Sequence, residues 1–260
     1  MADLDVVVVG AGPAGLSAAV WAHTLGLEYR VFDAAPTPGG QLLRVYNRVV
    51  DYVGIASTDG AALAATFTAH AEAVGARIDG SSEVARVDVA GLAVETAAGE
   101  RLTASSVVLA TGVRPRRLGV PGETDFVGRG VSPSASKYAD LFRGQRVLVV
   151  GGGDAAFEEA LILARVCERV TLAHRSDRFR ARRDFVARVA ADPRIEVVTG
   201  VELEAIEGTD RVERVRIAGR GGARSLDVSG VFVCAGVLPN SELVAGQVAL
   251  DDRGFVVVDA

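Results

Sequence analysis

Two segments of this chain repeat one pattern, in which an apolar run leads directly into a glycine-rich turn followed by small residues. The first is Val6–Val9 followed by Gly10-Ala-Gly-Pro-Ala-Gly15, and the second is Val147–Val150 followed by Gly151-Gly-Gly-Asp-Ala-Ala156. Glycines at such a turn let a pyrophosphate approach the backbone N–H groups at the start of a helix, because no Cβ atoms lie in the way. The pattern therefore predicts an α/β fold with two Rossmann-like, three-layer dinucleotide-binding domains.

The two turns differ in the residue that ends the next strand. Twenty-three residues after the first glycine of each turn stand Asp33 in one case and His174, followed by Arg175, in the other. An acid at this place accepts hydrogen bonds from ribose hydroxyls, as FAD or NAD presents them, whereas positive charge suits the 2′-phosphate of NADPH. Arg180 also falls where that phosphate is expected, while 182–183 read more simply as a solvated helix start. One unphosphorylated and one phosphorylated dinucleotide together indicate a flavoprotein reductase.

Turn residues and apolar periodicity place both glycine turns inside strand–helix–strand units. Pro13 lies near the start of the first helix, where its missing N–H costs nothing, and Gly26 ends that helix. Asp59 is predicted to cap the next helix and Gly75 to end it. The expected helices cover residues 16–25, 59–74 and 155–168, and the expected strands cover 4–9, 29–33, 83–89, 92–96, 101–108, 147–150, 170–173, 195–199, 203–207, 211–218 and 231–235.

Composition restricts the class of protein further. The chain has 260 residues, of which 49% are hydrophobic, and no stretch approaches the roughly 20 apolar residues that cross a membrane. Its start carries no basic and then apolar signal peptide, so a cytoplasmic location is expected. The formal net charge of −5 gives no support for binding nucleic acid.

The combination of motifs resembles the low-molecular-weight thioredoxin reductase group of pyridine-nucleotide flavoproteins over essentially the whole chain. This resemblance implies an NADPH domain inserted into a discontinuous FAD domain, with electrons passing from NADPH through FAD, and it suggests a homodimer. The implied bounds are 1–114 and 237–260 for the FAD domain and 115–236 for the NADPH domain. The matching segments are GAGPAG at 10–15, GGQL at 39–42, Ala110-Thr-Gly112, Gly128-Arg-Gly-Val-Ser132, GGGDAA at 151–156, His174-Arg-Ser-Asp-Arg-Phe-Arg180 and Phe232-Val-Cys-Ala-Gly-Val-Leu-Pro-Asn240.

The turns and the resemblance together predict the cofactor site. Gln41 is placed to bond a flavin or ribityl group, and Tyr46 stands where a stacking tyrosine lies in related reductases of ferredoxin or flavodoxin; a surface or core role for Tyr46 is equally open. No catalytic acid or base is predicted, because hydride transfer needs none. The predicted cofactor-binding residues are Gly10, Gly12, Pro13, Ala14, Gly15, Asp33, Gly40, Gln41, Tyr46, Ala110, Thr111, Gly112, Gly151, Gly153, Asp154, Ala155, Ala156, His174, Arg175, Arg180, Ala235 and Gly236.

Two departures from the family pattern separate this chain from a thioredoxin reductase. Ser134 and Lys137 stand where the family carries its redox dithiol, and the two cysteines of the chain, Cys167 and Cys234, are 67 residues apart and form no CxxC pair. Both are expected to be buried small hydrophobes without a disulfide. The sequence also stops at Ala260, before the family's Gly-Asp segment that holds the ribityl chain, so that either the protein is naturally short or the sequence is a fragment. Without that segment, severely weakened FAD binding is expected.

Two functions remain compatible with these observations. The first is an FAD-dependent NADPH oxidoreductase without its own disulfide, which passes electrons to a ferredoxin, flavodoxin, quinone, small disulfide or oxygen. The second is a non-catalytic nucleotide-binding protein derived from such an enzyme.

Overall fold

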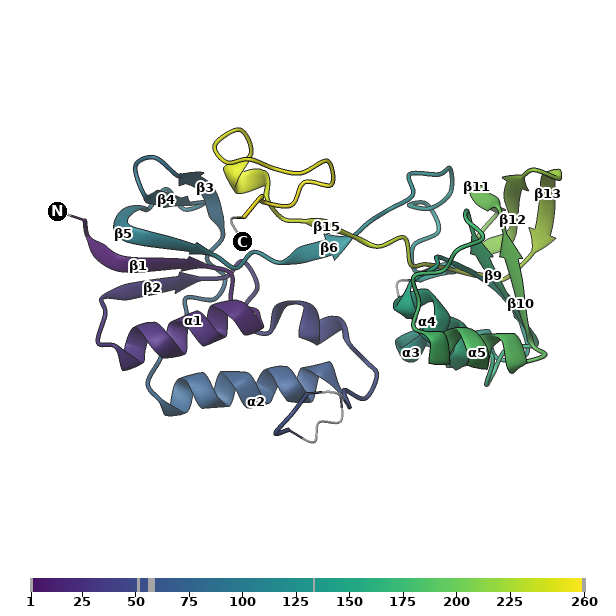
Figure 1. Cartoon of the computed structure of the whole chain (residues 1–260), viewed down its shortest axis with the longest axis horizontal. Helices are drawn as coiled ribbons and strands as arrows, with labels where there is room; N and C mark the ends of the chain where they lie inside the picture. Colours follow the sequence, from purple (N-terminus) through teal and green to yellow (C-terminus); the bar gives the residue numbers. More distant parts are fainter. Residues whose placement is uncertain (1, 51, 56–58, 133, 259–260) are drawn as a thin grey trace. The chain divides into compact units, whose positions relative to one another are not determined.

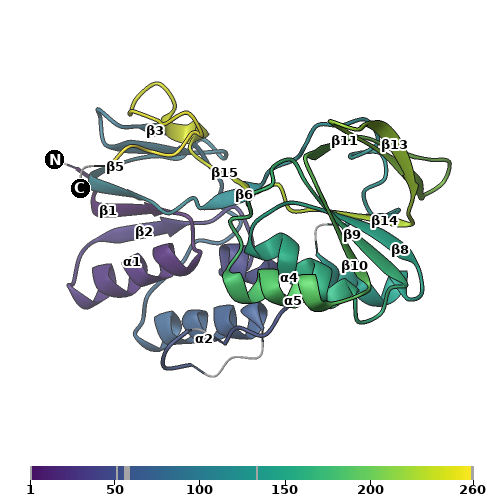
Figure 2. The ribbon, with the colours of Figure 1, turned by 45° about the vertical axis from the view of Figure 1, so that its right-hand side comes forward.

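The computed structural model describes residues 2–50, 52–55, 59–132 and 134–258. The chain divides into two compact units, which we call unit 1 (Met1–Arg114 with Leu238–Ala260) and unit 2 (Pro115–Val237) (Figures 1 and 2). Each unit contains one of the two glycine turns. No helix in the described part of the chain is both long and apolar enough to cross a membrane.

Unit 1 is built on a five-stranded sheet with the order β2-β1-β5-β4-β3. β1 pairs in parallel with β2 and β5, while β4 runs antiparallel to β5 and β3. Helices α1 and α2 lie on one face of this sheet (Figure 1). The elements are β1 (Leu4–Val9), α1 (Pro13–Thr24), β2 (Tyr29–Phe32), the 3-10 helix η1 (Gly40–Arg44), α2 (Gly60–Ala73), β3 (Val84–Asp88), β4 (Ala93–Thr96), β5 (Arg101–Leu109) and the 3-10 helix η3 (Glu242–Val244).

The apolar run before the first glycine turn is the centre of unit 1. Val7 and Val8 point to opposite faces of β1 and both are fully buried, because β1 is an inner strand with packing on both sides. Small side chains such as Ala19 let α1 pack closely on the sheet. Asp59 caps α2 by accepting a hydrogen bond from the Ala62 N–H at 2.8 Å, which confirms the predicted cap.

Unit 2 repeats the design with a fully parallel sheet of order β10-β9-β8-β14-β7. Helices α3, α4 and α5 cover one face, and a three-stranded antiparallel sheet, β11-β12-β13, lies on the other (Figures 1 and 2). The predicted α/β class is thus confirmed. The elements are β7 (Val131–Ser132), α3 (Ala135–Tyr138), the 3-10 helix η2 (Ala139–Phe142), β8 (Arg146–Val150), α4 (Asp154–Leu163), β9 (Arg169–His174), α5 (Arg183–Ala191), β10 (Ile195–Thr199), β11 (Val201–Gly208), β12 (Val212–Gly219), β13 (Gly222–Asp227) and β14 (Gly230–Val233).

Two short strands form the segments by which the chain passes from unit 1 to unit 2 and back. β6 (Val113–Pro115) and β15 (Val237–Pro239) pair in a two-stranded sheet, and the Arg116 N–H donates to the Gly236 carbonyl at 2.9 Å. Neither strand was expected from the sequence, because each has three residues and a proline.

The predicted helix over 155–168 is too long at its C-terminal end, since α4 ends at Leu163. The chain tightens there: the N–H groups of Arg165 and Val166 bond to carbonyls three residues back instead of four. Apolar residues continue through this turn into the core. A prediction based on periodicity alone therefore made the helix too long. The first helix also begins earlier than predicted, at Pro13, with proline in its first turn.

Candidate functional site

The glycine turn of unit 1 leaves β1 and opens α1, and its glycines have distinct structural roles. Gly10 has φ +104°, and a Cβ there would lie 2.4 Å from the Ala110 carbonyl oxygen; one at Gly15 would lie 1.8 Å from the Gly10 carbonyl oxygen. At Gly12, by contrast, a Cβ would meet only the Gly40 Cα, at 3.8 Å, among described atoms. Gly12 therefore leaves open space in front of the α1 N-terminus, where an anion would approach the N–H groups.

Asp33 follows β2 and holds the same turn from the side. Its carboxylate accepts hydrogen bonds from the N–H groups of Ala11 at 2.5 Å and Ala35 at 2.7 Å. The predicted ribose acceptor is thus fixed beside the glycine turn by two backbone donors. A carboxylate has further lone pairs beyond these two bonds, so hydroxyl groups of a ligand can still bind it.

The Gly39-Gly40-Gln41 segment packs against the back of the first turn. Gly39 has φ +133° and donates to the Ala11 carbonyl at 2.9 Å, while a Cβ on Gly40 would lie 3.1 Å from the Gly12 Cα. The Gln41 side-chain amide donates to the Val113 carbonyl at 2.6 Å. Gln41 is therefore a link to the segment after β5. Tyr46 follows η1 with 40% of its surface exposed.

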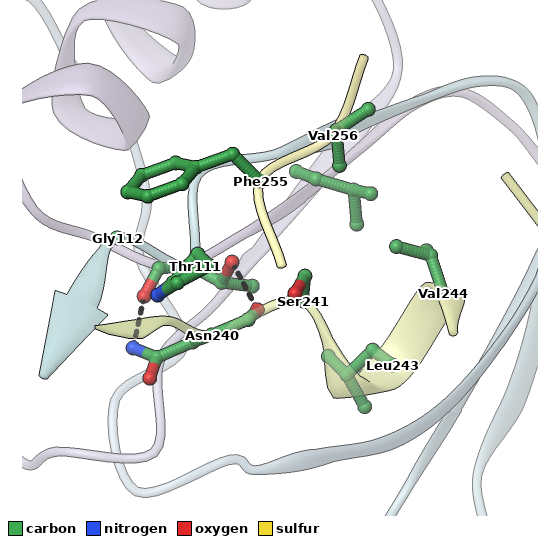
Figure 3. A pocket seen from close by; sticks show the side chains of 10 residues that line it. Thr111, Gly112, Asn240, Ser241, Leu243, Val244, Phe255 and Val256 are labelled. Atoms are coloured by element: carbon green, nitrogen blue, oxygen red, sulfur yellow. Dashed lines mark hydrogen bonds between the residues drawn. The ribbon is translucent and has the colours of Figure 1, made fainter. Parts of the chain in front are cut away.

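Behind the end of β5, a return segment of the chain closes on Thr111 and Gly112 (Figure 3). The Asn240 side-chain amide donates to the Thr111 carbonyl at 2.8 Å, and the Thr111 hydroxyl donates to the Asn240 carbonyl at 2.7 Å. The Asn240 N–H also donates to the Gly112 carbonyl at 3.0 Å, and Arg114 donates to the Asn240 Oδ1 at 2.8 Å. Asn240 was not among the predicted site residues, although it stands in the matched motif directly after a proline.

These groups border a cavity of about 280 Å³ that lies wholly within unit 1. Its walls are largely apolar, and polar groups enter mainly through Thr111, Asn240 and Ser241 (Figure 3). Gly112 has φ +67°, and a Cβ there would meet no described atom within 4 Å, so its backbone is open to a ligand.

The glycine turn of unit 2 has the same construction. Gly151 has φ +156°, and a Cβ there would lie 2.5 Å from the Cys234 carbonyl oxygen. A Cβ on Gly152 would lie 2.4 Å from the His174 ring, whereas one on Gly153 would meet nothing within 4 Å in the described part of the chain. Gly153 is the N-cap of α4 and, like Gly12 in unit 1, provides no side-chain cap to the first N–H groups of the helix. Both helix starts thus leave backbone donors for an anion.

The basic segment after β9, residues 175–182, folds back over this turn. The Arg180 N–H donates to the Gly152 carbonyl at 2.8 Å, and the Phe179 ring packs against the rings of Phe157 and His174 with centroid distances of 5.0 and 5.8 Å. Burial lowers the pKa of His174, and the positive charge of Arg175 and Arg180 lowers it further, against a hydrogen bond with the Arg178 backbone. The structure thus brings His174 and Arg180 to the turn, with the Arg175 and Arg180 side chains exposed.

Ala235 and Gly236 complete the predicted set at the end of β14. The Cys234 N–H donates to the Val150 carbonyl at 2.8 Å, which aligns the end of β14 with the start of the turn. Gly236 has φ +90°, and an added Cβ would contact none of the described atoms within 4 Å.

Of the two residues that the resemblance places at dithiol positions, Ser134 is the N-cap of the short helix α3 and Lys137 lies within it. Ser134 is buried with its Oγ 2.9 Å from the Ser136 Oγ, and Lys137 is exposed. Glu159 of α4, which the sequence did not single out, accepts a hydrogen bond from the Ala135 N–H. Burial raises the pKa of this carboxyl to about 7, against that hydrogen bond, and the charge of Glu158 raises it further.

Both cysteines are free thiols. Cys167 is buried as predicted, and Cys234 is only partly buried. Burial raises the pKa of Cys167 to about 11 and that of Cys234 to about 12, with the Glu159 charge contributing to the latter. Thiols with such pKa values hold little of the reactive thiolate at neutral pH.

Comparison with known proteins gives one consistent result. The family model for pyridine nucleotide-disulphide oxidoreductases matches residues 4–260. Thioredoxin reductase from Mycolicibacterium smegmatis is 40% identical over 259 residues, which cover 98% of this chain and 82% of that protein. The structure of Lactococcus lactis thioredoxin reductase in its FR conformation matches with a TM-score of 0.89 at 29% identity, over 99% of this chain and 85% of that chain. The T. acidophilum thioredoxin reductase structure matches with a TM-score of 0.86 at 31% identity, over 100% of this chain and 86% of that chain.

Proposed function

This chain belongs to the pyridine nucleotide-disulphide oxidoreductase family, and on that premise we propose that it passes electrons from NADPH through FAD to an external acceptor without a dithiol of its own. Enzymes of this family are FAD-dependent oxidoreductases that use NADPH.

The observation that carries the proposal is the pairing of two open glycine turns with opposite charge beside them. Gly12 and Gly153 each leave free space in front of a helix N-terminus that no described side chain caps. Beside the first stands Asp33, and beside the second stand His174 and Arg175. This arrangement supports FAD in unit 1 and NADPH in unit 2.

The residues present fit both cofactors, since a Cβ at the open glycines would fill the space in which a pyrophosphate lies. In unit 1, the Gly10–Gly15 turn and Asp33 would hold the pyrophosphate and ribose of FAD, with Gly40 and Gly112 close to the rest of the molecule. In unit 2, the Gly151–Ala156 turn would hold the NADPH pyrophosphate, and Arg175 and Arg180 its 2′-phosphate. When bound, the nicotinamide supplies a hydride from C4 that flavin N5 accepts, without a protein acid or base.

The chain's own contribution is binding and alignment. The exposed guanidinium groups of Arg175 and Arg180 match a phosphate in charge and geometry. The Asn240–Thr111 hydrogen bonds fix the segment that leads from the flavin side to unit 2.

The proposed lack of a dithiol is supported by the residues at the two positions where the resemblance places the cysteines. Neither the Ser134 hydroxyl nor the Lys137 ammonium forms a disulfide, and Cys167 and Cys234 lie elsewhere in the sequence with raised pKa values. We therefore expect electrons to leave the flavin directly. The acceptor class we propose comprises ferredoxin, flavodoxin, quinones, small disulfides and oxygen.

A spectral titration tests the proposal. Purified chain is mixed with FAD, desalted and titrated anaerobically with NADPH. We expect flavin absorbance near 450 nm that bleaches with NADPH and returns on addition of a quinone, but not oxidised thioredoxin. A colourless protein that still binds NADPH would support the non-catalytic alternative instead. Efficient reduction of thioredoxin would contradict the lack of a dithiol relay.

We also propose that the chain forms a homodimer through unit 1. Trp21 and Leu25 lie one turn apart at the end of α1, with 63% and 64% of their surfaces exposed. Large apolar side chains exposed together favour a protein contact. Light scattering of the wild type and of a Trp21→Glu variant tests this, and a monomeric wild type would contradict it.

A further inference from the structure

The basic segment 175–182 is attached to the glycine turn of unit 2 at two points, and one of them is an acidic side chain. The Arg180 N–H donates to the Gly152 carbonyl at 2.8 Å. Two residues later, the Arg182 N–H donates to the Asp154 Oδ1 at 2.7 Å. Arg180 thus lies within two residues of both attachments, so its position depends on them.

Asp154 places a negative charge beside the open end of the glycine turn of unit 2. It is the first residue of α4, exposed, and adjacent to Gly153, where the turn is open to an anionic ligand. A carboxylate there repels the phosphates of a dinucleotide. The helix dipole stabilises an acidic side chain in the first turn, but this stabilisation does not require a hydrogen bond to one particular residue. The Asp154 side chain instead bonds to a backbone N–H 28 residues away.

Other contacts of segment 175–182 also hold it against the glycine turn. The Phe179 ring packs on Phe157 of α4, and the Arg178 N–H donates to the Ser176 hydroxyl at 3.1 Å. The His174 ring occupies the space beside Gly152. Hydrogen bonds and packing within the chain therefore hold the segment on the turn, and such pre-organisation reduces the ordering cost of binding.

We propose that Asp154 is a positioning residue that sets the preference for NADPH over NADH, by holding segment 175–182 against the glycine turn through the Arg182 N–H. The inference rests on the proposed NADPH site in unit 2. Asp154 acts through the segment and not by contact with the 2′-phosphate. Its negative charge is incidental, and its oxygen as a hydrogen-bond acceptor is the required feature.

Matched variants separate the acceptor from the charge. Asp154→Asn keeps an Oδ1 acceptor and removes the charge, whereas Asp154→Ala removes both. Glu158→Gln removes an equal charge one helical turn further along α4 and serves as the control. The readout is the ratio of the dissociation constants for NAD⁺ and NADP⁺, measured by calorimetry on the full chain with oxidised nucleotides so that no turnover occurs.

A second pair of variants removes the donor. Arg182 has φ −56°, which proline adopts, so Arg182→Pro deletes the N–H with little change at this residue. Arg182→Ala keeps the N–H and removes the same guanidinium group. Because the two variants share the loss of the side chain, the difference between them isolates the hydrogen bond to Asp154.

We expect Asp154→Ala and Arg182→Pro each to lower the ratio about tenfold, the value of one lost hydrogen bond to a charged group. Asp154→Asn, Arg182→Ala and Glu158→Gln should stay within about twofold of the wild type. The double variant Asp154→Ala with Arg182→Pro should be no worse than either single variant, because both remove one interaction. NAD⁺ affinity should change little throughout.

Three results would overturn the inference. An unchanged ratio in both Asp154→Ala and Arg182→Pro, with near-wild-type thermal unfolding, would contradict the positioning role of Asp154. The proposed NADPH site would not be affected by that result. An Asp154→Asn variant as impaired as Asp154→Ala would assign the effect to charge. A wild-type chain that binds neither nucleotide would overturn the proposed function, and this inference with it.

Discussion

Units 1 and 2 contain the same strand–glycine turn–helix arrangement but carry net charges of opposite sign. In each, an inner parallel strand leads into a glycine turn whose first glycine lies against a neighbouring carbonyl, and whose N-cap glycine, Gly12 or Gly153, is open. The sequence of unit 1 carries 8 basic and 16 acidic side chains, a net charge of −8, whereas unit 2 carries 20 and 17, a net charge of +3. The backbone of the turn is common to both units, so the proposed difference in ligand rests on side chains.

The way each turn is attached to its neighbours also differs. In unit 1 a side chain, Asp33, accepts from the Ala11 N–H of the turn. In unit 2 the segment after β9 contributes its backbone, through the Arg180 N–H, and leaves the Arg175 and Arg180 side chains exposed. Unit 1 thus holds its turn with a charged side chain, whereas unit 2 holds its turn with backbone and leaves two guanidinium groups exposed. Under the proposed function, the charged groups beside each turn determine which nucleotide each unit selects.

The largest effects should come from a Cβ at the first glycine of each turn. Gly10→Ala places a methyl group 2.4 Å from the Ala110 carbonyl oxygen, and Gly151→Ala one 2.5 Å from that of Cys234. Displacing the backbone of the turn costs about 3 kcal/mol. We therefore expect FAD binding to be at least about 100-fold weaker in Gly10→Ala, and NADP⁺ binding to be weaker by the same factor in Gly151→Ala.

The comparison between the two units is sharpened if each variant weakens the binding of one cofactor only. Gly221→Ala, where a Cβ would meet no described atom within 4 Å, is the control and should bind both cofactors normally. Calorimetry with each nucleotide measures the result. A Gly10→Ala protein that loses NADP⁺ as strongly as FAD would show that the two turns do not act separately.

Arginine substitutions test the charge half of the comparison. Changing Arg175 and Arg180 together to alanine should weaken NADP⁺ about 10-fold to 100-fold and leave NAD⁺ nearly unchanged, since two charge-assisted contacts to the 2′-phosphate are lost. Arg183→Ala, at the first residue of α5, removes one charge of the same cluster and should have little effect. Equal losses for NADP⁺ and NAD⁺ would contradict a selective phosphate site.

Whether a feature could be predicted from the sequence depends on how far apart in the chain its interacting residues lie. Strands, turns and the Asp59 cap follow from local patterns, so most elements could be predicted. The Asn240–Thr111 bonds and the Glu159–Ala135 bond join residues 129 and 24 positions apart, and no local pattern encodes such pairs. The α4 end was missed because its turn is set by packing and not by a glycine or proline.

Asn240 tests whether the return segment supports unit 1 alone. Asn240→Ala removes a bond to Thr111 and one from Arg114, so we expect a loss of about 2 kcal/mol in unfolding free energy. Asn240→Asp keeps the acceptor for Arg114 and should recover part of it. Denaturant unfolding measures both, with NADP⁺ affinity as the control; a drop in that affinity would mean that the effect extends to unit 2.

Glu159 supplies a pH test that belongs to unit 2. Its pKa is about 7 in the folded chain and 4.5 in the reference state, so the folded form holds a proton that the unfolded form loses between these values. Stability should therefore fall as pH rises from about 4.5 to 7, by about 3 kcal/mol. Glu159→Gln should remove this slope and Glu158→Gln should retain it. Denaturant unfolding at pH 5 and pH 8 decides between them, and a slope that persists in Glu159→Gln would assign it to other groups.

The smallest effect is expected from the cysteines, both of which lie in unit 2. With pKa values of about 11 and 12, Cys167 and Cys234 remain protonated thiols at neutral pH, and a thiol is neither a good nucleophile nor a good electron relay. The paired variant Cys167→Ala with Cys234→Ala should therefore reduce a quinone within about twofold of the wild-type rate, the small change reflecting lost packing at Cys167. Anaerobic flavin reduction by NADPH, followed by acceptor turnover, measures the two half-reactions separately. A variant that keeps flavin reduction but loses acceptor turnover by tenfold or more would place sulfur chemistry between flavin and acceptor, and unit 2 would then be a redox partner of unit 1 and not only its nucleotide-binding counterpart.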